Sequence, residues 1–115
     1  MHELGIMENV LEVALEYAEQ NNIKKVRVIN LTVGDLSNIV PDYAQKFFNY
    51  VSRNTIAENA KINIQRIPAR IACRSCGVVT DMETKRLSFL CSGCGSKDLE
   101  LISGREFMIA SIEGE

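Results

Sequence analysis

The sequence predicts an α+β fold, in which a small sheet of three or more strands is covered by two helices and carries an inserted, four-cysteine zinc-ribbon-like module. Two segments have apolar residues at helical spacing, and three others have the β-branched or alternating residues of strands. Two Cys-x-x-Cys pairs lie between the last two expected strands. Two helices cannot bury their own apolar faces, so we expect both to pack on the sheet.

The first helix is expected near the amino terminus and is stopped by Asn21 and Asn22. Apolar residues recur there at steps of three and four, and the glutamates fall on other positions, which is the pattern of an amphipathic helix. The apolar set is Ile6, Met7, Val10, Leu11, Ala14, Tyr17 and Ala18, and the glutamates are Glu8, Glu12, Glu16 and Glu19. We interpret the glutamates as a solvated helix face.

A β-branched segment, 26–33, is expected to form the first strand and to end at Gly34. Its alternation slips between Val28 and Ile29, which predicts a bulge or burial of both faces at this point. A loop then leads to Pro41, a residue that suits the first turn of a helix.

The second helix is expected to start near Pro41 and to bury one apolar face. That face would consist of Tyr43, Ala44, Phe47, Phe48 and Val51. Three polar residues of the preceding loop, Asp35, Ser37 and Asn38, are predicted to cap this helix.

Two further strands are expected over 60–67, where Pro68 ends the segment, and over 105–112. The cysteines lie between them. The predicted organisation is therefore one α/β domain made of residues 1–69 and 103–115, and a zinc-binding module made of residues 70–102.

Four cysteines are present, as Cys73-x-x-Cys76 and Cys91-x-x-Cys94, with 14 residues between the pairs. Each pair is followed by a glycine, which supplies the backbone freedom that a thiolate-bearing turn often needs. Four thiolates make a closed tetrahedral shell for a structural zinc ion, and iron in a rubredoxin-like site is the chemical alternative. A pair of disulfides would require an oxidising compartment.

Charge and targeting signals favour a cytoplasmic protein. The first residues lack a basic region and Glu3 and Glu8 interrupt any apolar run, so we expect no signal peptide, and no stretch is long and apolar enough for a membrane span. The net charge is −2, without a basic cluster, which argues against nucleic acid as a partner. The single histidine excludes a serine, histidine and aspartate triad around a buried base, and we expect no enzymatic activity.

That histidine, His2, directly follows Met1. The α-amine of Met1 with the backbone nitrogen and imidazole of His2 could form fused chelate rings, and Glu3 could supply a fourth donor. Planar nitrogen donors suit nickel(II) or copper(II). On these residues alone, a frayed, solvated histidine is the more common situation near a chain terminus.

Taken together, these motifs resemble the HypA/HybF family of hydrogenase maturation proteins. The resemblance rests on Met1-His2-Glu3-Leu4, on Gly34-Asp-Leu-Ser37 with Val40-Pro41, and on the two cysteine pairs, so it spans nearly the whole chain. It implies a nickel metallochaperone for [NiFe]-hydrogenase, with structural zinc on the four cysteines and nickel as transient cargo at Met1, His2 and Glu3. The implied partners are a nickel-delivering GTPase and the hydrogenase large subunit.

This sequence departs from some relatives, which carry histidines beside the zinc cysteines or a further histidine in the zinc module. A nickel site here would be completed without a second imidazole, and Glu3, the sulfur of Met1 and Asp35 remain candidates. The alternative function is a zinc-ribbon module that binds protein or nucleic acid, and an iron-holding electron carrier is a third class. Both a monomer and a homodimer, including one swapped through the module, fit the sequence.

Overall fold

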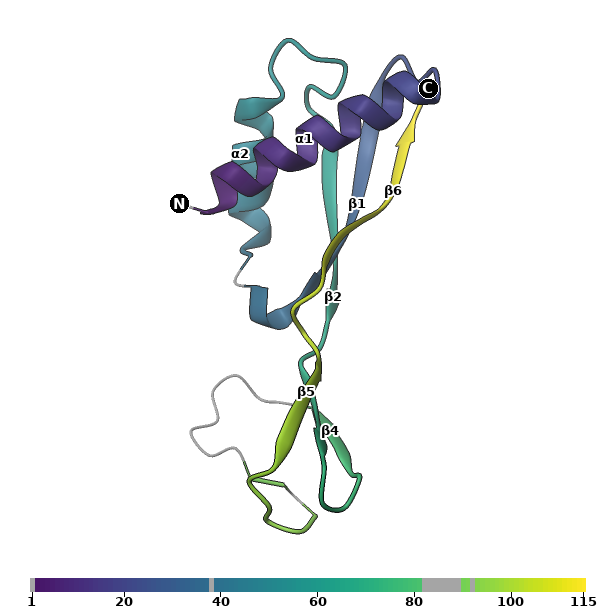
Figure 1. The fold of residues 1–115 in the computed structure, drawn as a ribbon. Helices are drawn as coiled ribbons and strands as arrows, with labels where there is room; N and C mark the ends of the chain where they lie inside the picture. Colours follow the sequence, from purple (N-terminus) through teal and green to yellow (C-terminus); the bar gives the residue numbers. More distant parts are fainter. Residues whose placement is uncertain (1, 38, 82–89, 92) are drawn as a thin grey trace. The chain divides into compact units, whose positions relative to one another are not determined.

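The computed structural model describes residues 2–37, 39–81, 90–91 and 93–115, with His2 described by its backbone alone. The chain forms two compact units. The first contains residues 1–32, 39–65 and 108–115, and the second contains residues 33–38 and 66–107. Figure 1 shows the course of the chain through both. No helix in the described ranges is long and apolar enough to cross a membrane.

Helix α1 (His2–Gln20) confirms the first predicted helix and starts earlier than its apolar pattern. Met7, Val10, Ala14 and Ala18 are buried, as expected. Tyr17 was predicted on the buried face, but 44% of its surface is exposed because it lies at the edge of the apolar stripe. The helix stops as predicted: the side-chain amide of Asn21 donates to the carbonyl of Tyr17 at 2.8 Å, and Asn22 has a positive φ of 56°.

Helix α2 (Pro41–Val51) begins at the predicted proline and packs against α1. Ala44 and Phe48 are buried, whereas Tyr43 is 56% exposed, contrary to the prediction. Val40 occupies the N-cap position and no side chain caps the helix. The predicted capping role is therefore wrong for the described residues, and Asn38 lies outside them.

The capping prediction failed because the loop residues have partners elsewhere in the second unit. The Ser37 hydroxyl donates to the carbonyl of Glu106 at 3.3 Å, and the Asp35 carboxylate lies 3.7 Å from the Arg66 guanidinium. The three residues Asp35–Ser37 form a short 3-10 turn. Tertiary contacts have overridden a local preference for capping.

One sheet has the strand order β2-β1-β6, with β1 (Val26–Gly34), β2 (Lys61–Ile67) and β6 (Phe107–Gly114). The amide of Lys24 donates to Glu115 and the side chain of Asn30 donates to Ser111, so β6 runs antiparallel to β1. Val26 is hydrogen-bonded to Ile56, and Asn30 is hydrogen-bonded to Asn63. Residue numbers therefore rise in the same direction on both segments, so β2 runs parallel to β1.

Both helices lie on the same side of this sheet (Figure 1). The core beneath them includes Val26, Ile29 and Leu31 of β1. Val28 is half-buried beside the buried Ile29, so at the predicted slip both faces of β1 are at least partly covered. The predicted arrangement of a three-stranded sheet with two helices is confirmed.

The second sheet has the order β4-β3-β5 and lies in the second unit, with β3 (Arg70–Cys73), β4 (Val79–Asp81) and β5 (Leu99–Ser103). All pairings in it are antiparallel, and an irregularity between Arg70 and Ile71 shifts the register against β5. The sequence pattern predicts no strands in this module. Strands of three to five residues carry too little periodic pattern to be recognised.

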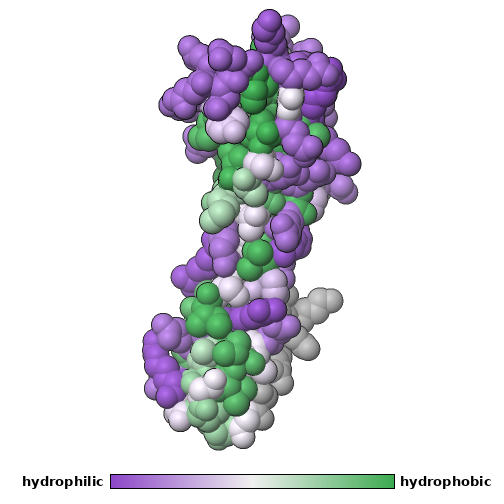
Figure 2. Space-filling model, turned by 90° about the vertical axis from the view of Figure 1, so that its right-hand side faces the viewer, coloured by the Kyte–Doolittle hydropathy of each residue, from purple (hydrophilic) through white to green (hydrophobic). Residues whose placement is uncertain are grey.

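Apolar side chains are exposed on the second unit. Val79 is 53% and Ile102 is 49% exposed, and apolar surface is visible over this unit in Figure 2. A unit of this size has too few residues to bury all of them in a core of its own. Its stability is therefore expected to depend on its cysteine cluster.

Candidate metal centre

The cysteines lie on two turns of closely similar backbone structure. The amide of Gly77 donates to the carbonyl of Cys73, and the amide of Gly95 donates to the carbonyl of Cys91, each at 2.9 Å. Gly77 has φ +80° and Gly95 has φ +74°, a left-handed conformation that side chains rarely adopt. The role predicted for these two glycines is confirmed.

Backbone amides of both turns point at sulfur. The amide of Cys76 lies 3.4 Å from the Cys73 sulfur, and the amide of Cys94 lies 3.4 Å from the Cys91 sulfur. The Gly93 amide is a second donor to Cys91, at 3.3 Å. Such donors stabilise thiolates more than thiols, so the turns favour the form of cysteine that binds metal.

The two turns bring the four sulfurs into one cluster. All of them lie within 4.8 Å of one another, with Cys73 Sγ to Cys94 Sγ at 3.6 Å and Cys76 Sγ to Cys91 Sγ at 3.5 Å. Bonds of about 2.3 Å to a tetrahedral zinc ion would place sulfurs about 3.8 Å apart, so the donor set fits such an ion. The four cysteines are free thiols without disulfide bonds, which contradicts the disulfide alternative.

Because the four thiols lie close together, their pKa values differ from one another. The Cys76 amide lowers the pKa of Cys73 to about 6. At Cys94, the Ser96 amide favours the thiolate, but the Cys73 thiol, burial and the remaining sulfurs outweigh it and raise the pKa to about 12. Four negative sulfurs cannot lie this close without a cation, and a bound metal ion would replace the retained protons.

Polar contacts connect the turns around the cluster. The Ser75 and Ser96 hydroxyl oxygens are 3.1 Å apart, and the Arg74 guanidinium lies 3.1 Å from Asp98 and 3.9 Å from Glu100. The sequence pattern does not predict these contacts, and the signal for them is the position of the residues beside the cysteine pairs. Because Arg74 is engaged by carboxylates, it offers little to a nucleic-acid phosphate.

The amino-terminal candidates are only partly covered by the described residues. Helix α1 begins at His2, and Glu3 lies half-buried in its first turn. Met1 and the side chain of His2 lie outside the described residues. The first four amides of a helix have no acceptor within the helix, so the amide of His2 makes no hydrogen bond that α1 needs. Asp35, the remaining candidate, is ion-paired with Arg66.

Two helices on a three-stranded sheet, together with a cluster of four thiols, are the features of a small metal-binding protein of the α+β class. Residues 1–114 match the family described as "Hydrogenase/urease nickel incorporation, metallochaperone, hypA". The chain belongs to this HypA family of hydrogenase maturation factors and nickel metallochaperones.

Individual relatives can be aligned with this chain over nearly their whole length. The hydrogenase maturation factor HypA of Nostoc sp. is 41% identical over 115 residues, which cover 100% of this chain and 96% of that protein. The factor of Aquifex aeolicus is 34% identical and is covered over 98% of its length.

Two solved structures share the fold. The solution structure of the nickel metallochaperone HypA from Helicobacter pylori superposes with a TM-score of 0.64 at 18% identity, covering 97% of this chain and 96% of that one. A second solution structure of a HypA protein gives a TM-score of 0.73 at 20% identity, covering 100% of this chain and 97% of that one.

Proposed function

We propose that this protein binds nickel(II) at its amino terminus and helps to insert it into [NiFe]-hydrogenase during maturation. The observation that carries the proposal is the family match over residues 1–114, which includes the Met1-His2-Glu3 terminus. Nickel would be held by the α-amine of Met1, the backbone nitrogen and imidazole of His2, and a donor from Glu3. The protein would act by binding and release, without catalytic turnover.

The four cysteines are proposed to hold a structural zinc ion. Cys73 and Cys91 are buried and the four sulfurs have the spacing of a closed tetrahedral shell, which supports a resident metal. Such a shell leaves no open position for a substrate. We assign nickel transfer to the first unit and metal-dependent stability to the second.

A labile terminal site suits delivery. Its donors would be one side chain, the terminal amine and backbone at the start of a helix, and chain termini are in general held less firmly by a core than internal segments are. By contrast, four thiolates release zinc slowly because the unit around them depends on the metal. The proposed acceptor is the hydrogenase large subunit, and the proposed donor is a GTPase of hydrogenase maturation, both in the cytoplasm.

The proposal is tested by replacing His2 with Ala in the full, untagged chain. Nickel binding, measured by titration calorimetry, should be lost, while zinc content and the circular dichroism spectrum remain those of the wild type. Equal loss of zinc in this variant would contradict separate sites, and unchanged nickel binding would contradict the terminal site.

A further inference from the structure

One face of α2 carries aromatic and cationic side chains that the fold does not use. Phe47 is half-buried and Tyr50 is 61% exposed. With the half-buried Leu4 of α1 and the stem of Lys46, these rings line a hollow of about 270 Å³. The α2 docking face is defined here as Leu4, Lys46, Phe47, Tyr50 and Arg53.

Cations border this apolar hollow. The Arg53 guanidinium lies 5.2 Å from the centre of the Tyr50 ring, a cation–π contact that orients both groups. Among the described residues, neither Lys46 nor Arg53 makes an ion pair with a carboxylate. The positive charge of this face is therefore available to a partner.

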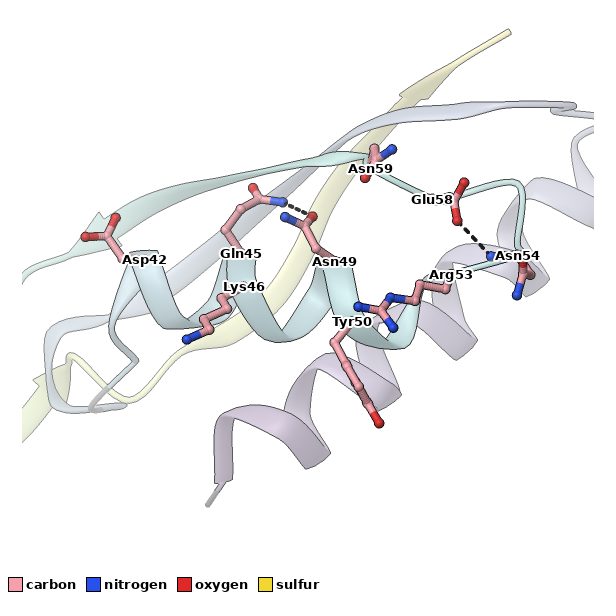
Figure 3. Close-up of a pocket in the computed structure, with 9 residues that line it drawn as sticks. All are labelled: Asp42, Gln45, Lys46, Asn49, Tyr50, Arg53, Asn54, Glu58 and Asn59. Carbon is pink, nitrogen blue, oxygen red and sulfur yellow. Dashed lines mark hydrogen bonds between the residues drawn. The ribbon is translucent and has the colours of Figure 1, made fainter.

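A neighbouring groove of about 780 Å³ has three residues in common with the α2 docking face, namely Lys46, Tyr50 and Arg53. This groove is also lined by carboxylates. Figure 3 shows Lys46 and Tyr50 on the side of α2 that faces α1, with Gln45 and Asn49 on the opposite side, toward β2. The two carboxylates of the groove, Asp42 and Glu58, are likewise on the β2 side of α2 and point away from Tyr50 (Figure 3).

Several polar groups on the β2 side of the groove already make internal hydrogen bonds. The Gln45 amide group donates to Ala60 at 3.0 Å and accepts from the amide of Ile62 at 2.7 Å. The carboxylate of Glu58 accepts from the amide of Asn54 at 3.0 Å. The α1 side presents the cations Lys46 and Arg53 beside an apolar hollow, whereas the carboxylate of Asp42 lies on the other side of α2 (Figure 3).

We propose that the α2 docking face binds an acidic segment of a protein partner, with an apolar side chain of that segment seated between Leu4, Phe47 and Tyr50. Exposed tyrosine and arginine in a hollow are typical of residues that dominate binding energy at interfaces. Lys46 and Arg53 would pair with carboxylates of the partner, which sets orientation and speeds association.

The position of Leu4 places the α2 docking face next to the proposed nickel site. It lies two residues after His2, so a protein bound at the α2 docking face touches the segment that holds the proposed nickel site. This inference rests on the proposed function and adds to it the place where a partner in nickel transfer docks.

The test measures the affinity of the full, zinc-loaded chain for two purified proteins, the maturation GTPase and the hydrogenase large-subunit precursor. The double variant Lys46→Glu with Arg53→Glu, and separately Tyr50→Ala, should weaken binding to at least one of them by about tenfold or more. Lys24→Glu, an exposed charge reversal elsewhere in the first unit, is the matched control and should leave affinity unchanged. Nickel titration of every variant should match the wild type.

Unchanged affinity for both proteins, an equal loss in the Lys24→Glu control, or no binding by the wild-type chain would overturn the docking proposal. A wild-type chain that binds no nickel would instead contradict the proposed function. A photo-crosslinking residue in place of Tyr43, which is 56% exposed and lies one helical turn before Lys46 and Phe47, identifies the bound segment. A cross-linked segment without acidic residues would also overturn the proposal.

Discussion

The backbones of Gly34 and Gly104 lie in direct contact within the second unit. A Cβ atom on Gly34 would overlap the carbonyl group of Gly104, and Gly104 itself has φ +119° with its Cβ position 2.8 Å from the Cα of Ala69. The Gly34 amide donates to Glu106 at 2.7 Å and the Leu36 amide donates to Gly104 at 2.8 Å. These contacts join the loop after β1 to the segment that links β5 and β6.

Gly34→Ala should therefore destabilise the protein. The added methyl group meets backbone on a neighbouring segment, which cannot move aside as a flexible side chain can. A loss on the order of 1–3 kcal/mol in the free energy of unfolding is expected. Denaturant unfolding monitored by circular dichroism measures it.

Gly5→Ala is the matched control for this substitution. A Cβ atom at Gly5 has nothing within 4 Å, and alanine is the better helix former, so this variant should gain up to about 1 kcal/mol. If Gly34→Ala were as stable as Gly5→Ala, the close backbone contact would be wrong.

Cysteine variants should distinguish buried from exposed ligands. Cys73→Ser and Cys76→Ser should both lower zinc content, and Cys73→Ser should lower the melting temperature further. Cys73 is 3% exposed and its sulfur accepts the Cys76 amide, whereas Cys76 is exposed. Metal analysis and thermal unfolding before and after a chelator measure both effects. A melting transition that is unchanged by zinc removal would show that the metal does not stabilise the unit.

An additional residue before Met1 should sharply weaken nickel binding. It converts the terminal amine to an amide and moves the charged amine away from His2, so the fused chelate rings cannot form. Titration calorimetry of extended and native chains makes the comparison, and zinc content is the internal control. Equal nickel affinity in the two proteins would argue against the amine as a ligand.

Acid should release nickel before zinc. The proposed ligands must be unprotonated, and their ordinary pKa values are about 6.5 for imidazole and about 7.7 to 8.0 for a terminal amine. Lowering the pH from about 7.5 to about 6 therefore increases the competition of protons with nickel at both ligands, and nickel affinity should fall by about an order of magnitude or more. Zinc should remain bound, since four thiolates hold it in a closed shell.

Competition with a chromophoric chelator at the two pH values measures this difference. Nickel affinity that is independent of pH over this interval would argue against His2 and the Met1 amine and would point to carboxylates such as Glu3 and Asp35 as the ligands.

The sequence by itself determined the two helices, the three strands of the first sheet and the four-cysteine cluster. Each leaves a local signal: apolar spacing in α1, β-branched residues in β1, and a glycine after each Cys-x-x-Cys pair. The family resemblance was also visible, because the Met1-His2-Glu3 terminus and the cysteine pairs occur together in one chain.

Only the tertiary structure decided which partners the loop residues take. Asp35 and Ser37 look like helix caps in sequence, yet contacts with Arg66 and Glu106 hold them elsewhere. The hollow between Leu4 and Tyr50 and the contact between Gly34 and Gly104 also depend on segments distant in sequence. A local pattern specifies a residue's own backbone and its preferred face, but it carries no information about which distant groups come within bonding distance.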